Sequence, residues 1–233
     1  MRLQLFTKRK KNIFLSLITL HLSLFTITKA LAQEAATDQT KLGIRGGIIL
    51  GMNVTQVDGD DYAGFTKIGL NTGFYGQIPV SKIFFVSTEI LYSQRGSKSQ
   101  VQPQGSTQLP FKFVTNYAEI PVLFHFQERR AVNFGAGVSY GRLVKQQVDV
   151  NGLVYSMDYC TGKPDITDSS AYECIKRSDY SVVADANYIP IEHLSINIRF
   201  AYSIVPFGYF GTSNFHNRGI YHNMLSFRVM WVF

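Results

Sequence analysis

The residues that could carry out acid–base or nucleophilic chemistry are few and scattered. Downstream of residue 32 the chain holds four histidines, His125, His193, His216 and His222, and no spacing joins them into a metal-binding or catalytic motif. The sequence contains no HExxH pair, no CxxC pair and no glycine-rich phosphate loop. His222 could meet a serine or an acid near one rim of the fold, which leaves a lipid-modifying enzyme as an alternative. Otherwise the sequence predicts no enzyme, no cofactor and no metal site.

The chain has two cysteines, Cys160 and Cys174, in one long segment between apolar stretches. In the oxidising compartment that an exported chain would reach, two such cysteines typically form a disulfide. A metal site would need further ligands nearby, and the segment 143–179 contains no histidine. We therefore predict a disulfide within this loop.

Charged residues also recur inside the apolar stretches. Three bases and three acids share the polar face at a similar expected depth, and they are Arg45, Glu89, Glu119, Asp185, Arg199 and Arg228. Lys67 and Arg95 are expected nearer the outer mouth. Unpaired charges are costly in a narrow protein interior, so we expect these residues to form a salt-bridged plug. A small ion path along the same charges is the alternative.

Strands must position these side chains, because apolar and polar residues alternate along the chain with a period of two. Each alternating segment is long enough to cross a bilayer at a tilt. The eight segments are 42–52, 67–78, 84–96, 114–126, 132–141, 180–188, 194–203 and 221–233. Pro121 lies inside the fourth segment and cannot donate a ladder hydrogen bond, so we expect a bulge there.

The links between the segments separate two β architectures. Links of about four residues alternate with much longer ones along the whole series. This alternation is typical of an up-and-down barrel with short periplasmic turns and long outer loops. We predict an all-β fold, a closed antiparallel up-and-down transmembrane β-barrel of eight strands. A soluble secreted β-sandwich or lipocalin-like binder is the alternative.

The N-terminal region has the pattern of an export signal. The basic cluster Lys8–Lys11 precedes an uncharged stretch over 12–28, and Ala30-Leu31-Ala32 forms an A-x-A cleavage pattern before Gln33. We expect a signal peptide over 1–32 that is cleaved between Ala32 and Gln33, a short polar leader over 33–39 and a barrel domain over 40–233. An uncleaved membrane anchor is the alternative for the N-terminal stretch. Residues 1–32 hold six basic residues and no acid, so the remaining 17 bases nearly balance 16 acids. This balance argues against a nucleic-acid partner.

The last segment ends on an aromatic residue. Phe233 is preceded at alternating positions by Trp231, Val229 and Phe227. The pattern resembles the terminal strand that the barrel assembly machinery of Gram-negative bacteria recognises. We expect these four residues to act as the assembly signal.

Several short motifs occur in order along the chain. They are LGIRGG (42–47) with GMN (51–53), EILYSQRG (89–96), YAEIP (117–121), FGAG (134–137) and RFAYS (199–203). Together they resemble the motifs of the PorT-like outer-membrane β-barrel proteins. Each is weak alone, and their order and spacing carry the resemblance. It implies an eight-stranded outer-membrane barrel and accounts for Pro121, but it does not specify a biological role. The long third loop with two cysteines departs from the family pattern.

We therefore expect an integral protein of the Gram-negative cell outer membrane, with a structural, adhesive or binding role carried by its extracellular loops. A lipid-modifying enzyme and a small ion-conducting channel are the alternatives within the membrane. The expected partners are outer-membrane lipid and lipopolysaccharide, the barrel assembly machinery and periplasmic chaperones. The sequence does not identify an extracellular ligand.

Overall fold

A computed structural model describes residues 43–59, 64–99, 110–129, 131–160, 174–209 and 219–233. The expected signal peptide, the Ala32–Gln33 cleavage site and the leader over 33–39 lie outside the described residues. The described part contains no helix that is long and apolar enough to cross a membrane.

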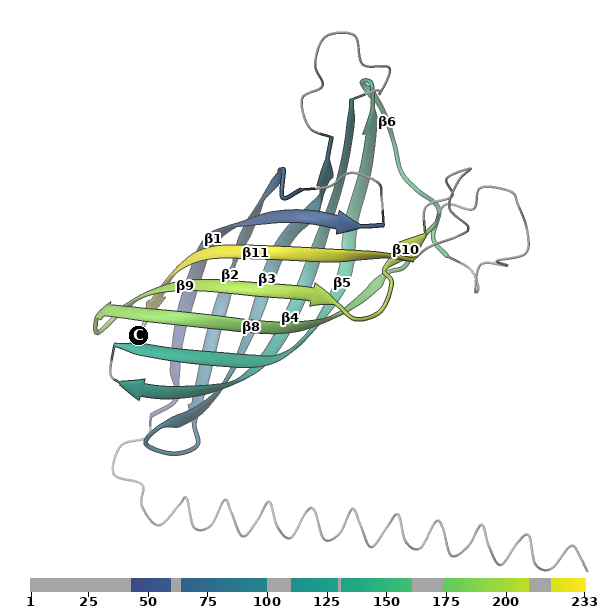
Figure 1. Cartoon of the computed structure of the whole chain (residues 1–233). Helices are drawn as coiled ribbons and strands as arrows, with labels where there is room; N and C mark the ends of the chain where they lie inside the picture. Colours follow the sequence, from purple (N-terminus) through teal and green to yellow (C-terminus); the bar gives the residue numbers. More distant parts are fainter. Residues whose placement is uncertain (1–42, 60–63, 100–109, 130, 161–173, 210–218) are drawn as a thin grey trace, which may run out of the picture. The chain divides into compact units, whose positions relative to one another are not determined.

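Eight long strands wind into one closed barrel (Figure 1). They are β1 (Arg45–Asp58), β2 (Lys67–Pro79), β3 (Phe84–Lys98), β4 (Phe111–Arg129), β5 (Val132–Val150), β8 (Ser178–Ile191), β9 (Leu194–Ser203) and β11 (Gly219–Val232). Each pairs antiparallel with the next, and β1 pairs with β11 along twelve residues to close the ring. The prediction of an eight-stranded antiparallel barrel is confirmed.

Alternation along each strand separates the two faces of the wall. Outward positions are mainly apolar, as with Ile48, Leu50 and Ile90, which are exposed. Inward positions are mainly polar and buried, as with Asn53 and Ser93. This distribution is the reverse of that in a soluble protein, and it suits a barrel whose outer surface faces hydrocarbon.

The two ends of the barrel differ in their connections. At one end, here called the turn end, β2–β3, β4–β5 and β8–β9 are joined by short links. At the other, the loop end, β3, β4 and β5 run on beyond their neighbours, and β6 (Leu153–Tyr155) pairs with β5 (Figure 1). Two further short strands at the loop end, β7 (Cys174–Ile175) and β10 (Gly208–Tyr209), pair with each other, and β10 pairs with β11.

The bulge expected at Pro121 occurs elsewhere. Pro121 stays in register with Ser139 of β5, and on its other side the pairing of β3 with β4 is interrupted at Glu89 and Ile90 before it resumes in the same register. The proline therefore removes two residue pairs from the β3–β4 ladder, but it does not insert an extra residue into β4. Two register shifts occur in the β4–β5 ladder instead. One lies next to the turn, between Phe126 and Arg129, and the other is on β5, where Val144 and Lys145 both point outward opposite Asn116 and Tyr117 of β4.

Candidate functional site

Charged side chains inside the barrel form two separate clusters. The turn-side ion cluster consists of Glu89, Asp185, Arg199 and Arg228, contributed by β3, β8, β9 and β11. The loop-side ion cluster consists of Arg95, Glu119 and Asp179, contributed by β3, β4 and β8. All seven side chains are buried, and none is more than 7% exposed.

Glu89 is the centre of the turn-side ion cluster. Arg199 donates to both of its carboxylate oxygens at 2.8 Å, which is the bidentate geometry that makes such pairs strong. Arg228 donates to Glu89 Oε2 at 2.8 Å and to Asn197 Oδ1 at 2.7 Å. Arg199 also donates to Asp185 Oδ2 at 2.7 Å, so the cluster contains two acids and two bases and is electrically balanced.

Arg95 is the centre of the loop-side ion cluster. Its two terminal nitrogens lie 2.6 Å from Glu119 Oε1 and 2.6 Å from Asp179 Oδ2. Serine hydroxyls add hydrogen bonds to both acids, with Ser139 donating to Glu119 Oε1 and Ser203 donating to Asp179 Oδ1, each at 2.7 Å. The buried Arg95 guanidinium is therefore paired with two acids, one on β4 and one on β8.

The expected ring of six charges at one depth is therefore corrected. Arg45 lies exposed at the first residue of β1 and forms no ion pair with a described residue. Glu119 pairs instead with Arg95, which was expected nearer the mouth. Asp179 was not predicted, although it has the same inward parity as Asp185. Strand tilt and shear cause these differences, because they displace residues of equal count on different strands to different heights.

A serine, a histidine and an aspartate meet beside the turn-side ion cluster. Ser87 Oγ lies 2.7 Å from His125 Nε2, and His125 Nδ1 lies 3.6 Å from Asp185 Oδ1. A Cβ at Gly135 would lie 2.4 Å from the His125 ring, so glycine is needed for this approach. This Ser–His–Asp arrangement resembles the catalytic triad of a hydrolase. Ser87 and His125 are nearly inaccessible, however, and the His125 ring stacks on Phe85 at 4.4 Å. A substrate therefore has no access to the Ser87 hydroxyl.

The mouth at the loop end is filled by an apolar cap. Its buried members are Val57, Phe113, Tyr117, Leu143, Val148, Met157, Ile175, Phe207 and Ile220. Met157 is held by Gln146, which bonds both its N–H and its carbonyl oxygen. Cys160 and Cys174 are joined by a disulfide, which ties the segment after Met157 to β7.

His222 lies beneath this cap rather than at an accessible rim. Its ring stacks on Phe207 at 3.6 Å between centroids and meets the Tyr117 ring edge-on. It is 1% exposed. Among the described residues, no group of three or more His, Cys, Asp or Glu side chains could hold a metal ion.

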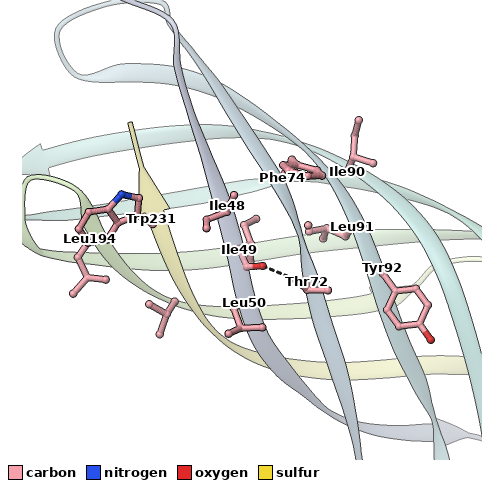
Figure 2. Close-up of a pocket in the computed structure, with 12 residues that line it drawn as sticks. Ile48, Ile49, Leu50, Thr72, Phe74, Ile90, Leu91, Tyr92, Leu194 and Trp231 are labelled. Carbon is pink, nitrogen blue, oxygen red and sulfur yellow. Dashed lines mark hydrogen bonds between the residues drawn. The ribbon is translucent and has the colours of Figure 1, made fainter.

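The outside of the barrel carries an apolar groove over β11, β1, β2 and β3, with Leu194 of β9 at its edge, drawn in Figure 2. Its walls include Ile48, Leu50, Phe74 and Ile90, and Thr72 turns its hydroxyl to donate to the Ile49 carbonyl at 2.8 Å. The groove therefore presents little hydrogen-bonding capacity. It lies on the apolar face of the wall, away from the buried charges.

The C-terminal residues line the same outer face. Phe227, Val229, Trp231 and Phe233 are all outward and exposed. The Phe233 N–H donates to the Gly46 carbonyl at 2.7 Å, so the last residue remains attached to β1. Their role as an assembly signal stays a prediction.

Comparison with solved structures finds other eight-stranded outer-membrane barrels at low identity. Ail, the attachment invasion locus protein of Yersinia pestis, is 12% identical, with 81% of this chain and 98% of that chain covered and a TM-score of 0.46. Neisserial surface protein A is 10% identical, with 81% and 96% covered and a TM-score of 0.43. OprG from Pseudomonas aeruginosa is 12% identical, with 82% and 94% covered and a TM-score of 0.34.

No curated protein matches the chain in sequence. The sequence profile of a family described as outer membrane protein beta-barrel domain matches residues 31–207, which is most of the chain. The protein is therefore located in the Gram-negative outer membrane. The chain belongs to the outer membrane protein beta-barrel domain family.

Proposed function

We propose that this protein is a non-conducting, non-enzymatic outer-membrane barrel that acts through binding by its extracellular loops. The observation that carries the proposal is the filled interior. The two ion clusters occupy the lumen at different heights, and the apolar cap covers the loop end. An ion would have to displace ion-paired arginines and then cross an apolar layer, and both steps are costly.

The outer surface at the loop end supports a binding role. In barrels of this kind the short turns are periplasmic and the long loops extracellular, so the loop end faces outward. The β5–β6 hairpin stands there with Leu153 75% exposed and Val154 56% exposed (Figure 1). Apolar side chains exposed to water at a hairpin tip are typical of a contact surface. The Cys160–Cys174 disulfide fixes the chain that follows this hairpin to β7, which lowers the entropy lost on binding.

Within the family we place the protein among the PorT-like barrels, on the order and spacing of its short motifs. We further propose that Phe233 and the three aromatic or aliphatic residues before it on the outer face recruit the barrel assembly machinery.

Single-channel recording in planar bilayers tests the closed lumen. The unmodified protein should give no steady conductance, whereas Arg95→Met, which leaves Glu119 and Asp179 without their shared cation, should give brief flickering openings. Steady ion-selective conductance from the unmodified protein would contradict the proposal and favour a small channel.

Adhesion of cells that display the protein tests the loop surface. The probes are immobilised glycans, immobilised collagen and neighbouring cells that display the same protein. Leu153→Glu with Val154→Glu should lower retention on at least one probe. Val80→Glu in a turn at the opposite end is the matched control, because Val80 is also exposed and apolar. Equal retention for both variants would count against binding by this hairpin.

A further inference from the structure

Outward-facing tyrosines mark the edge of the apolar band at the loop end. Five strands contribute one each, and these are Tyr92, Tyr140, Tyr180, Tyr202 and Tyr221. The rings of Tyr140 and Tyr180 lie 5.4 Å apart, and those of Tyr202 and Tyr221 lie 6.2 Å apart. Aromatic girdles of this kind lie at the level of the lipid headgroups. The tyrosine girdle therefore gives the depth of the outer leaflet boundary on this barrel.

Two unpaired bases lie directly beyond the tyrosine girdle on β5. Arg142 follows Tyr140 by two positions on the same outward face, and Lys145 follows the outward residue Val144. Both side chains are exposed, and neither forms an ion pair with a carboxylate of the described part. The buried arginines of the lumen are all paired, so these two cations stand apart from them.

The β-bulge is what turns Lys145 outward. Leu143 faces the interior, so an uninterrupted strand would also place Lys145 inside the barrel. The extra residue at Val144–Lys145 reverses the parity, and the next inward residue is Gln146. Bulges disturb the hydrogen-bonded ladder and commonly serve to redirect a side chain. Here the bulge brings a second cation to the same face as Arg142.

Polar groups from the neighbouring strands surround these cations. Ala118, Arg142 and Ser178 stand in one row across β4, β5 and β8, and the small Ala118 side chain leaves the row open on one side. Arg142 Nη1 lies 3.3 Å from Ser178 Oγ, which also lies 3.2 Å from the Tyr140 hydroxyl. In the adjoining row Asn116 pairs with Lys145. The Arg142 guanidinium and the Ser178 and Tyr140 hydroxyls thus lie together at headgroup depth, and Lys145 stands in the next outward row on the same strand.

We propose that Arg142 and Lys145 form a binding site for a phosphate group of an outer-leaflet phosphorylated glycolipid, the lipid A portion of lipopolysaccharide. A guanidinium matches the geometry of phosphate in a bidentate manner, and a lysine adds a mobile point charge. The position beyond the tyrosine girdle commits the site to lipid-borne phosphate rather than to a free anion. This proposal gives lipid contact a specific place on the chain, and it does not depend on the proposed binding role of the extracellular loops.

Retention of lipid A by the purified protein tests the site. The full chain is reconstituted in phosphatidylcholine vesicles with lipid A, extracted in mild detergent and analysed for bound lipid by native mass spectrometry. Arg142→Gln with Lys145→Gln should lower the retained lipid A about tenfold, the change expected when roughly one charge-assisted hydrogen bond is lost. Arg45→Gln with Lys82→Gln is the matched control, because it removes two exposed cations at the turn end.

Two further arms identify the recognised group. The unmodified protein should retain little dephosphorylated lipid A. The amount should be no greater than the amount of intact lipid A that the Arg142→Gln, Lys145→Gln variant retains. Millimolar inorganic phosphate in detergent, followed by phosphorus NMR line width, should show no binding. A heat-dependent shift in gel migration verifies that each variant is folded. The proposal is overturned if the two variants retain equal lipid A, if dephosphorylated lipid A is retained equally well, or if inorganic phosphate alone binds.

Discussion

Arginine occupies two contrasting settings in this barrel. Arg199 and Arg228 lie in the lumen, at most 3% exposed, and share Glu89 between them. Arg142 lies on the outer face beyond the tyrosine girdle, exposed and without an acidic partner in the described part. A charge withdrawn from water is tolerated only when it is paired, whereas an exposed charge carries little cost. Pairing therefore identifies the lumen arginines as structural and leaves the rim arginine available for a ligand.

The largest effect is expected from breaking the pairing in the lumen. Glu89→Gln leaves two buried arginines without their shared acid, and loss of one partner of a buried pair costs about 3–5 kcal/mol. The free energy of unfolding in urea should fall by that amount, with the fluorescence of Trp231, the only tryptophan, as the signal. Glu192→Gln in an exposed turn is the control and should have little effect.

A second substitution sharpens this test. After Glu89→Gln, Arg199 still has Asp185 at 2.7 Å, whereas Arg228 keeps its neutral partner Asn197 and, among the described residues, only one acid, Asp185 at 3.7 Å. Arg228→Met should therefore restore more stability to the Glu89→Gln protein than Arg199→Met does. Equal rescue by the two, or no loss from Glu89→Gln in the first place, would refute the view that pairing stabilises the lumen.

The next effect tests the outer face on either side of the tyrosine girdle. Ile90→Arg places a cation in the apolar band, where it costs about 2–4 kcal/mol at the bilayer midplane. Val144→Arg places the same side chain beyond the girdle, beside Lys145, and should be tolerated. Folding yield into phosphatidylcholine vesicles, followed by heat-dependent gel migration, compares the two. Similar yields would mean that the girdle does not mark the membrane boundary.

The smallest effect is expected at the rim. In phosphatidylcholine vesicles without lipid A, Arg142→Gln with Lys145→Gln should change the free energy of unfolding by no more than about 0.5 kcal/mol, because the substitutions are on the surface and break no pair. The urea midpoint is the measurement. A loss as large as that of Glu89→Gln would show that these cations are structural after all.

Much of the wall could be predicted because a strand's faces are set by local alternation. The outward placement of Ile90 and Phe134 and the inward placement of Glu89 and Asp185 follow from parity within a single strand. Pro121 shows where a local rule was insufficient. The missing N–H predicts a local defect, but the defect can be two lost rungs or an inserted residue, and only the neighbouring strands decide between them.

Partners across the lumen could not be predicted in the same way. Glu89 and Arg199 are 110 residues apart and meet because strand tilt and barrel shear bring them to one height. The same shear separates Glu119 from that cluster and pairs it with Arg95, and Arg45 lies beyond the barrel's packed interior. Strand tilt and barrel shear depend on all the strands together, so the sequence of one strand does not specify them.

The sequence by itself determined the strand count, the face of most side chains and the presence of charges inside the wall, because these depend on a period of two and on the alternation of link lengths. The tertiary structure decided which charges pair, that two clusters form in place of one, and that a bulge turns Lys145 from the lumen to the rim. The physical reason is that pairing and parity after a bulge depend on register between strands, and register is a property of the closed barrel as a whole.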